Sequence, residues 1–342
     1  MNILPDNSIS RFKELVHTSA SVVIVSHTHP DGDALGCVSA MYSYLTRTLD
    51  KNAIVLIGTD TPENLDFILR GVQKTDDVSV MAGCDLIVGL DFNCLSRTDD
   101  KFQEALLACR AKKILIDHHP HPDTGQFDLV FSETRISSAS ELLFWILRKV
   151  MGDSLKGLSK AALTAMMCGM TTDTNNFANS VWPSTLDMAS QLLAAGVDRD
   201  GIVQRIFNSY RSARVRAISY LLDNCLVLKD SYAYMIVSKE IKRKFGIREG
   251  ELEGLVNIPL TIKRIKVSIT LTEDNGFYRV SLRSKRGINV NRLATVSFHG
   301  GGHEQASGGK LFLESDITSA RDIPAYVEEC TARFLQATAK RI

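Results

Sequence analysis

Residues 22–36 read VVIVSHTHPDGDALG, a run of branched apolar residues followed at once by histidines, aspartates, proline and glycine. The run Val22–Ser26 is continuous and β-branched, which is typical of a strand buried on both faces. Proline and glycine interrupt regular structure after it, so a loop presents His27, Asp31 and Asp33 together before a helix begins. A buried strand that leads through a polar loop into a helix predicts an α/β sheet.

The alternation of strand and helix continues over the first half of the chain, which predicts a mostly parallel sheet with helices on both faces. In such sheets ligands bind at the carboxyl ends of the strands, so the residues just after each strand are candidates for a site. The further strands predicted here are Ala53–Ile57, Leu86–Leu90, Lys113–Ile116 and Leu129–Phe131, and the helices are Gly36–Arg47, Leu65–Leu69, Phe102–Ala111, Ala139–Val150 and Lys160–Met170.

Two helical stretches follow Trp182-Pro183, at residues 184–195 and 199–222, and the second is expected to bridge two domains. Beyond it the pattern predicts a smaller α+β unit, with a hairpin turn at Glu273–Gly276 because Asn-Gly suits tight turns. The predicted domains are residues 1–195 and 225–342, joined by a helical linker at 196–224. Strands are expected at Cys225–Leu228, Tyr232–Val237, Lys263–Thr272 and Phe277–Leu282, and helices near Leu252–Val256 and Arg292–Phe298.

Composition places the chain among ordinary globular proteins. Its 342 residues are 44% hydrophobic and 23% charged, which excludes disordered, collagenous and coiled-coil classes. No apolar run approaches the ~18 residues of a membrane span, and the N-terminus lacks the pattern of a signal peptide. Seven cysteines without a CxxC pair favour reduced thiols over a disulfide framework. We therefore expect a cytoplasmic protein with no membrane partner.

The net charge of +1 is a cancellation between two unlike halves. Residues 1–200 carry 17 Lys+Arg and 25 Asp+Glu, a charge of −8, and residues 201–342 carry a charge of +9. An acidic half suits metal binding, and a basic half suits an anionic ligand. On charge alone, a chance difference between two solvated surfaces explains the pattern equally well.

Histidines and aspartates gather at the ends of the predicted elements. Three short clusters hold seven of the eight histidines: His27/His29, His118/His119/His121 and His299/His303. The first two clusters directly follow predicted strands. The aspartates that stand at strand or helix ends in the first half are Asp31, Asp33, Asp91, Asp117 and Asp173.

Four separate elements thus bring carboxylates and imidazoles to one edge of the predicted sheet. Asp and His ligands without Cys favour Mn²⁺ or Mg²⁺, with Zn²⁺ or Co²⁺ as alternatives. The candidates suffice for two ions roughly 3.5–4 Å apart and bridged by one carboxylate, an arrangement that suits phosphoester hydrolysis. Any single aspartate is equally well read as a helix N-cap and any single histidine as a loop residue, but four clusters favour the metal site.

The second half offers a separate set of anion donors. The segment SLRSKRGIN at 281–289 is dense in cationic side chains, and Arg can bind a phosphate in bidentate fashion. The segment HGGGH at 299–303 provides bare backbone amides that an anion can approach closely. A glycine triplet alone is typical of a flexible turn, and with glycines again at 308–309 we expect an irregular loop here. With Arg283 nearby in sequence, phosphate binding becomes the favoured interpretation.

The pattern His-x-x-x-Asp-x-Asp at 27–33, the lone Asp91, the triplet at 117–119 and Asp173 resemble the four motifs of the DHH phosphoesterase family. The sequence GGGH at 300–303 is similar to the signature of the DHH-associated domain that ends many members. Together these motifs span almost the whole chain. Within the family, they look most like the group that hydrolyses nanoRNA and 3′-phosphoadenosine 5′-phosphate (pAp).

The resemblance implies a role for each matching position. One Mn²⁺ would be bound by His27 and Asp31 and a second by Asp33, His118 and Asp173, with Asp91 bridging the two. Asp91 would form the catalytic group together with His119, which would face the scissile phosphate, and Asp117, which would orient a neighbouring histidine. The far end of the nucleotide would be bound by Arg283, Ser284, His299, Gly300, Gly301, Gly302 and His303.

The implied activity is Mn²⁺-dependent hydrolysis of short single-stranded oligoribonucleotides to mononucleotides and of pAp, with pApA and cyclic di-AMP as further substrates and Mg²⁺ or Co²⁺ as substitute ions. Two other functions stay open, an exopolyphosphatase or inorganic pyrophosphatase with the same metal motifs, and a non-catalytic nucleotide sensor. A homodimer is compatible with this fold. Two positions depart from the family pattern. His29 stands where many relatives have Asn or another polar residue, and Cys37 stands where Ser is usual.

Overall fold

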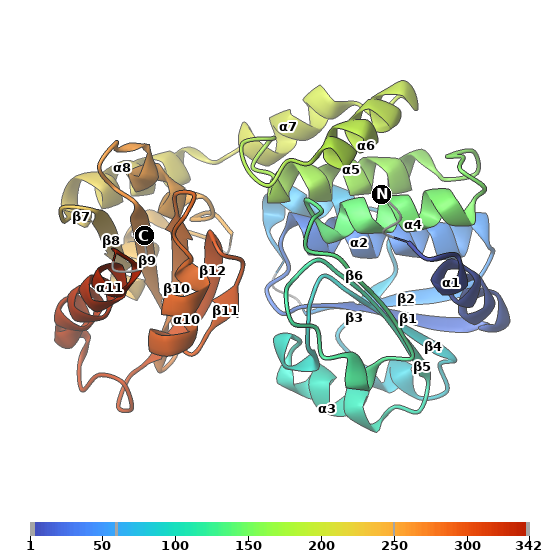
Figure 1. Ribbon diagram of the computed structural model, residues 1–342, viewed down its shortest axis with the longest axis horizontal. Helices are drawn as coiled ribbons and strands as arrows, with labels where there is room; N and C mark the ends of the chain where they lie inside the picture. The colour runs from blue at the N-terminus through green and yellow to red at the C-terminus, as the bar shows by residue number, and fades with distance from the viewer. Residues whose placement is uncertain (1–3, 59–60, 249, 340–342) are drawn as a thin grey trace. The chain divides into compact units, whose positions relative to one another are not determined.

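The computed structural model of the chain describes residues 4–58, 61–248 and 250–339 (Figure 1). It divides into two compact units, Met1–Ser209 and Tyr210–Ile342, which we call the first and the second unit. The division falls inside the expected linker at 196–224. Helix α7 (Arg199–Phe207) belongs to the first unit and α8 (Ser212–Asn224) to the second.

The single helix expected over 199–222 is therefore two helices. The break lies at 208–211, where Arg211 has extended backbone angles just before α8. The Arg211 guanidinium forms a bidentate pair with Glu251, with Nε 2.8 Å from Oε1 and Nη2 2.7 Å from Oε2. This contact lies within the second unit and holds the start of α8 there. The helical periodicity of the sequence did not reveal the break between α7 and α8, because the break depends on a contact with a residue distant in the sequence.

The first unit is built on one parallel sheet of six strands in the order β3-β2-β1-β4-β5-β6. The two strands in the middle, β1 and β4, lie where the strand order reverses, which is where open α/β sheets bind ligands. The predicted parallel sheet is confirmed, and only the two-residue β3 was not predicted. The strands are β1 (Ser21–Ser26), β2 (Asn52–Leu56), β3 (Lys74–Thr75), β4 (Leu86–Leu90), β5 (Lys112–Asp117) and β6 (Leu129–Ser132).

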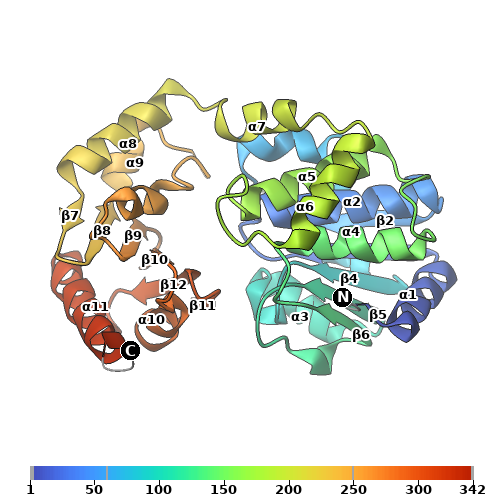
Figure 2. The ribbon, with the colours of Figure 1, turned by 45° about the horizontal axis from the view of Figure 1, so that its top comes forward.

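Helices cover both faces of this sheet, as predicted (Figure 2). Val22 and Ile24 of β1 point into a core shared with α1, α2, α4 and α5, while Val23 and Val25 point into a core shared with α3. The α-helices are α1 (Asp6–Thr18), α2 (Gly32–Ser43), α3 (Asp100–Ala108), α4 (Ala139–Val150), α5 (Lys160–Asp173) and α6 (Pro183–Ala194). Shorter helical turns are Tyr44–Thr48, Glu63–Leu69, Val78–Met81, Leu95–Arg97 and Thr124–Gln126.

Helices α2, α4 and α5 approach one another so closely that only glycine fits at two contacts, Gly36 of α2 against α5 and Gly169 of α5 against α4. A Cβ on Gly36 would lie 2.6 Å from the Ala165 carbonyl oxygen, and a Cβ on Gly169 would lie 2.0 Å from Ser140 Oγ. Real Cβ atoms do not make contacts this short. The glycines therefore let the start of α2 and the end of α5, which carry the candidate ligands, lie next to each other.

The second unit has a mixed sheet in the order β11-β12-β10-β9-β8-β7, in which only β8 and β9 pair in parallel. Helices α10 and α11 pack on one face and α8 on the other. The strands are β7 (Val227–Leu228), β8 (Tyr232–Val237), β9 (Val267–Glu273), β10 (Phe277–Ser284), β11 (Gly301–Gly302) and β12 (Ala306–Phe312). The further helices are α9 (Lys239–Phe245), α10 (Val290–Ser297) and α11 (Ile323–Ala339), with short turns at Leu255–Thr261 and Ala320–Asp322.

The hairpin predicted at Glu273–Gly276 is confirmed, with the Asp274 amide 2.9 Å from the Phe277 carbonyl and Gly276 at φ +80°. The irregular loop expected around Gly300 and Gly309 is wrong. Gly300 directly precedes β11 and Gly309 lies within β12. A Cβ on Gly300 would be 2.0 Å from the Gly308 carbonyl oxygen, and one on Gly309 would be 2.3 Å from that of Phe298. These glycines permit close backbone packing.

Among the described residues, no helix combines the length and the apolar character that a membrane span needs.

Candidate metal centre

The loop after β1 presents its ligands in fixed orientations. Asp31 caps the N-terminus of α2, where its Oδ1 accepts hydrogen bonds from the amides of Asp33 and Ala34 at 3.0 and 3.1 Å. His27 Nδ1 lies 2.8 Å from the Thr28 carbonyl oxygen. Because a carbonyl only accepts, a proton sits on His27 Nδ1, which leaves Nε2, 3.5 Å from Asp91 Oδ2, as the nitrogen that can bind an ion.

Asp91 lies between two histidines at the end of β4. Its Oδ1 is 3.5 Å from His118 Nε2 and its Oδ2 is 3.5 Å from His27 Nε2. Among the described residues, Asp91 Oδ1 has no hydrogen-bond partner although it is buried. The residue also has a left-handed backbone with φ +64°, a conformation that costs energy in a non-glycine residue and is concentrated at functional sites.

Asp33, His118 and Asp173 form a second group. Asp33 is fully buried, and its two oxygens accept the amides of Ala139 and Ser140 at 2.7 and 2.9 Å, so the N-terminus of α4 holds this carboxylate. His118 Nε2 lies 3.9 Å from Asp33 Oδ2 and 3.2 Å from Asp173 Oδ2. Asp173 is the last residue of α5, and the carbonyls at a helix C-terminus favour a nearby cation.

The structure thus brings together all six residues that were predicted as metal ligands. In each of two groups, one ligand atom per residue lies within 4.8 Å of the others, the groups being His27/Asp31/Asp91 and Asp33/His118/Asp173. Imidazole and carboxylate ligands suit a divalent ion such as Mn²⁺, Zn²⁺ or Co²⁺. Asp91 Oδ1, which has no hydrogen-bond partner among the described residues, lies 3.5 Å from His118 Nε2 and so faces the second group. The donor set therefore fits two divalent ions with Asp91 between them.

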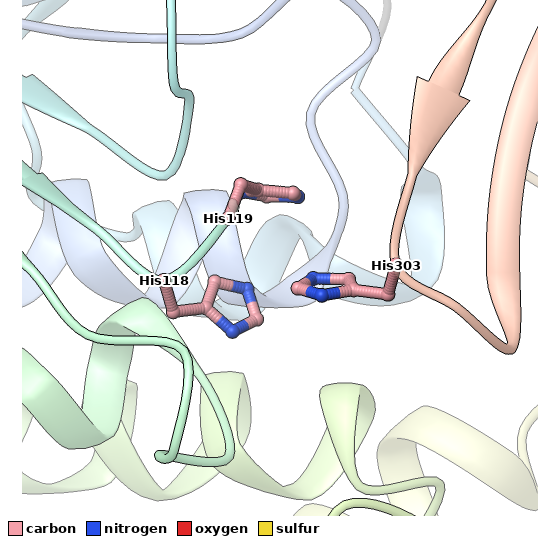
Figure 3. A group of neighbouring side chains, drawn as sticks. All are labelled: His118, His119 and His303. Carbon is pink, nitrogen blue, oxygen red and sulfur yellow. The ribbon is translucent and has the colours of Figure 1, made fainter. Parts of the chain in front are cut away.

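The predicted positioning residue Asp117 holds His119 at two points. Its Oδ1 lies 2.7 Å from His119 Nδ1, and its Oδ2 accepts the His119 amide at 3.1 Å. Asp117 is fully buried at the end of β5. The His119 ring stands edge-on to His118 at 4.7 Å, and both rings project from the loop that follows β5 (Figure 3). Nε2 of His119 therefore lies on the side of the ring away from Asp117.

Neighbouring charges and burial shift the pKa values of three of these candidate ligands. Burial lowers the pKa of His27, but its hydrogen bond to Asp91 and the charge of Asp31 outweigh burial and raise the pKa to about 9. His118 behaves in the same way, with Asp91 and Asp173 raising its pKa to about 10. Burial and the charge of Asp91 raise the pKa of Asp33 to about 7. Without an ion, the site thus holds protons that a divalent ion would displace.

Two hydrogen bonds join the loops that carry the candidate ligands. The Thr28 amide donates to the Arg97 carbonyl at 2.9 Å, which joins the loop after β1 to the segment after Asp91. Asn93 Nδ2 donates to the Pro120 carbonyl at 2.8 Å, which joins that segment to the loop after β5. Motion of one ligand loop is therefore limited by the other two.

Three residues close in sequence to the candidate ligands, His29, Cys37 and His121, belong to neither of the two ligand groups. His29 and His121 are exposed with left-handed backbones, and they belong to no candidate ligand group within the described ranges. Cys37 is buried behind the ligands, with its Sγ 3.3 Å from Ser140 Oγ and 3.8 Å from Asp33 Oδ1. Cys37 therefore contacts both the Asp33 carboxylate and Ser140, whose amide donates to that carboxylate.

A strained loop directly after Asp173 was not predicted. Asn175, Asn176 and Phe177 have φ of +46°, +58° and +66° in succession. The loop is held by the Phe177 amide, which donates to Thr174 Oγ1 at 3.0 Å, and by Arg199, which bonds to Asn176 and lies 5.5 Å above the Phe177 ring. The only sequence signal is the Asn-Asn pair, because Asn tolerates left-handed backbone better than most residues.

The strand register of the second unit places part of the predicted phosphate-binding set at one end of its sheet. Arg283 pairs with Ala306, and the His303 amide donates to the same Ala306 carbonyl at 2.8 Å, in the turn between β11 and β12 (Figure 3). Gly302 pairs with Ser307 next to them. Ser284 donates its hydroxyl to the Ile288 carbonyl at 2.6 Å and so fixes the turn after Arg283.

His299 lies elsewhere on this unit. Its Nε2 is 2.9 Å from Asp316 Oδ1, and its ring packs edge-on against Phe312 at 5.5 Å. Phe312 and Ala306 are at opposite ends of β12, about 20 Å apart at the usual rise of a strand. The structure therefore does not bring His299 together with Arg283 and His303.

Two asparagines near the glycine segment were missed by sequence reasoning. The Oδ1 atoms of Asn289 and Asn291 are buried and have no hydrogen-bond partner among the described residues. A Cβ on Gly301 would lie 3.5 Å from Asn291 Oδ1, so this oxygen faces the glycine segment. Buried acceptors of this kind are normally satisfied by water or by a ligand. Their signal in the sequence, an Asn-Val-Asn triplet after a basic segment, is weak.

Comparison with known proteins identifies the family of this chain. The model of the DHH family, N-terminal domain, matches residues 21–170, and that of the DHHA1 domain matches residues 229–327. A protein of Streptococcus mutans named "Probable bifunctional oligoribonuclease and PAP phosphatase NrnA" is 31% identical over 85% of this chain and 90% of its own length. The chain belongs to the DHH phosphoesterase family.

Two further comparisons extend along nearly the whole of this DHH phosphoesterase. A bifunctional oligoribonuclease and PAP phosphatase of Bacillus subtilis is 26% identical over 87% of this chain and 93% of its own length. The crystal structure of an exopolyphosphatase-related protein of Bacteroides fragilis has a TM-score of 0.88, at 32% identity, and covers 99% of both chains. Both units of the DHH phosphoesterase therefore have counterparts in these proteins.

Proposed function

We propose that this protein is a two-metal phosphoesterase that cuts short oligoribonucleotides to mononucleotides and removes a phosphate from pAp. The observation that carries the proposal is the pair of ligand groups joined through Asp91. The relatives from Streptococcus mutans and Bacillus subtilis, whose names state these two activities, support the choice of substrates.

Two divalent ions, when bound, would supply an activated water and neutralise charge on the phosphoryl oxygens. We assign His27 and Asp31 to one ion, Asp33, His118 and Asp173 to the other, and Asp91 to both. Mn²⁺ is the proposed resident ion, with Mg²⁺ and Co²⁺ as substitutes, because the set mixes carboxylates with imidazoles and contains no thiolate. Restoring a chelated sample with each ion in turn should give the highest activity with Mn²⁺, and equal activity with Ca²⁺ would contradict the assignment.

The residues of the chain itself position the substrate. Asp117 accepts hydrogen bonds from the His119 amide and from His119 Nδ1, which sets the ring plane of His119 and directs its Nε2 toward the proposed place of a phosphoryl oxygen. In the second unit, Arg283, His303 and the amides of the 300–302 segment are proposed to bind another phosphate of the substrate. The unsatisfied oxygens of Asn289 and Asn291 would accept hydrogen bonds from ribose hydroxyls or base amino groups.

The central experiment follows release of mononucleotides from 5′-labelled RNAs of two to five nucleotides, and of phosphate from pAp, with Mn²⁺ or with chelator. Asp91→Ala should abolish turnover of both substrates. His121→Asn is the matched control, because His121 is exposed, lies two residues beyond His119, and has a backbone that Asn tolerates. No metal-dependent product from either substrate would refute the proposal, as would full activity of Asp91→Ala.

A second candidate, an exopolyphosphatase or inorganic pyrophosphatase, is favoured by the similarity to the exopolyphosphatase-related protein of Bacteroides fragilis. A side-by-side kinetic comparison of pAp, pApA, trinucleotide RNA, cyclic di-AMP, pyrophosphate and polyphosphate separates the candidates. Faster release of phosphate from polyphosphate or pyrophosphate than from any nucleotide would favour this second function. A nucleotide sensor would bind these nucleotides without turning any of them over.

A further inference from the structure

Two cysteines of the first unit lie together at the amino end of its sheet. Cys84 stands two residues before β4 and Cys109 three residues before β5, and the register pairs Leu86 with Lys112. Because β4 and β5 are adjacent and parallel, the segments that lead into them lie side by side, and the Sγ atoms of Cys84 and Cys109 are 4.0 Å apart. Asp91 and Asp117 are at the carboxyl ends of the same strands, so this pair is separate from the metal centre.

The pair is open to small molecules. Both side chains are partly exposed, and they line a surface hollow of about 670 Å³ formed by residues 81–85, 105 and 108–112. A hollow of this size admits small organic molecules. Arg110 and Lys112 give it a basic rim.

The other thiols of the described chain differ from this pair. Cys37 and Cys168 are buried, and Cys94, Cys225 and Cys330 are partly exposed without a second thiol in bonding distance within that part of the chain. A disulfide needs sulfurs about 2.05 Å apart, so side-chain rotation that closes about 2 Å is required at the pair. Among the described residues, Cys84 and Cys109 are therefore the two thiols placed closely enough to be joined by side-chain rotation.

We propose that Cys84 and Cys109 are a redox-active dithiol that a peroxide converts into a reversible disulfide. The Cys109 thiolate attacks one peroxide oxygen, the O–O bond breaks, and the leaving oxygen takes a proton to give water and a sulfenic acid on Cys109. The Cys84 sulfur then attacks the Cys109 sulfur, the S–O bond breaks, and a second water leaves. Two thiols supply the two electrons that reduce one peroxide.

The order of the two steps follows from the surroundings of Cys84. Burial, the adjacent Cys109 and Asp85 raise the pKa of the Cys84 thiol to about 12. Because the thiolate is the nucleophile, the raised pKa slows attack of Cys84 on a dissolved peroxide, and we assign the first attack to Cys109. The resolving attack by Cys84 is intramolecular, with the two sulfurs held 4.0 Å apart, and this proximity favours it although the thiol is rarely ionised.

The experiment treats the folded full-length protein with hydrogen peroxide, blocks remaining thiols by alkylation, and digests with trypsin and Asp-N together. Cleavage before Asp77, Asp85 and Asp91 separates Cys84 from Cys94, so the crosslink is unambiguous. We expect the peptides 77–84 and 102–110 to be joined, the free thiol count to fall from seven to five, and dithiothreitol to reverse both changes.

Variants make the test decisive. In Cys84→Ser we expect a sulfenic acid on Cys109 that dimedone traps, and in Cys109→Ser we expect no crosslink and slower loss of thiols. Cys225→Ser is the control, since its thiol is partly exposed and unpaired with another cysteine, and it should form the same crosslink as the unaltered protein. The proposal is overturned if Cys84 and Cys109 oxidise no faster than Cys225 or if the crosslink joins other cysteines. Circular dichroism of each variant establishes that it is folded.

Discussion

Gly169 joins helix packing to the metal centre, and Gly169→Ala is expected to damage both. A Cβ at this position would lie 2.0 Å from Ser140 Oγ, 2.8 Å from Ser140 Cβ and 2.7 Å from Asp33 Oδ1. Ser140 also donates its amide to Asp33. The added methyl group must therefore push the start of α4 and the Asp33 carboxylate out of place.

The size of the effect follows from these contacts. Overpacking of a tight interior contact costs about 1–3 kcal/mol. For a domain of the size of the first unit, each kcal/mol lowers Tm by about 2–4 °C, so the metal-free variant should unfold about 2–12 °C lower. Disturbing the groups that hold a metal ligand reduces metal affinity by about 10–100-fold, and the loss should appear at the ion bound by Asp33.

Thermal unfolding followed by circular dichroism and Mn²⁺ titration followed by electron paramagnetic resonance measure the two effects. Ser140→Gly removes the crowded Oγ and Cβ but keeps the backbone amide that holds Asp33. The double variant Gly169→Ala with Ser140→Gly should therefore recover most of both losses relative to Ser140→Gly alone. An unaltered Tm and Mn²⁺ affinity in Gly169→Ala, or no recovery in the double variant, would refute this reasoning.

Three other changes give separate tests. Asp117→Asn should lower kcat about 10–100-fold while the Mn²⁺ dissociation constant changes less than twofold, because Asp117 orients His119; steady-state kinetics and Mn²⁺ titration check this, and equal losses in both would contradict it. The raised pKa values of His27, about 9, and His118, about 10, stabilise the metal-free fold fully below pH 6.5 and lose this effect as the pH rises through 9 to 10. The Tm of the metal-free protein should thus fall over that range, and Mn²⁺ binding near pH 7.5 should release protons, which calorimetry in buffers of different ionisation enthalpy detects; a Tm that rises, or no proton release, would argue against it. Arg199→Ala should free the loop that directly follows the proposed ligand Asp173 and raise the Mn²⁺ dissociation constant about 5–30-fold, for a loss of about 1–2 kcal/mol, with Arg199→Lys intermediate; an unchanged dissociation constant in both would show that the loop needs no such support.

Much of the first unit could be predicted because its sheet is buried on both faces. Val22–Ser26 and Leu86–Leu90 are continuous apolar runs, and a polar residue directly after such a run has few explanations other than function. The ends of strands and of one helix therefore indicated the candidate residues, and the resemblance to the DHH phosphoesterase family selected the six proposed ligands among them. Lys74–Thr75 forms a strand without any pattern, because two residues that pair at the edge of a sheet need none.

Features that depend on tertiary contacts could not be predicted. The hold on Asp33 comes from amides more than a hundred residues further along the chain, and no local pattern indicates it. Gly308 and Gly309 lie within β12 although glycine is unfavourable in strands, because the backbone of Phe298 and Gly300 packs against them. His299 is close in sequence to His303, but its left-handed backbone and the pair with Asp316 direct it to another part of the unit.

The residues proposed as metal ligands are spread from His27 to Asp173, and this spread determines when a complete set of them exists during synthesis. A growing chain that ends before Asp173 lacks one ligand of the second group and the C-terminus of α5. Domains fold largely as units while the chain is being made. Stalled or truncated fragments that end before Asp173 would therefore lack a complete pair of the proposed ion sites.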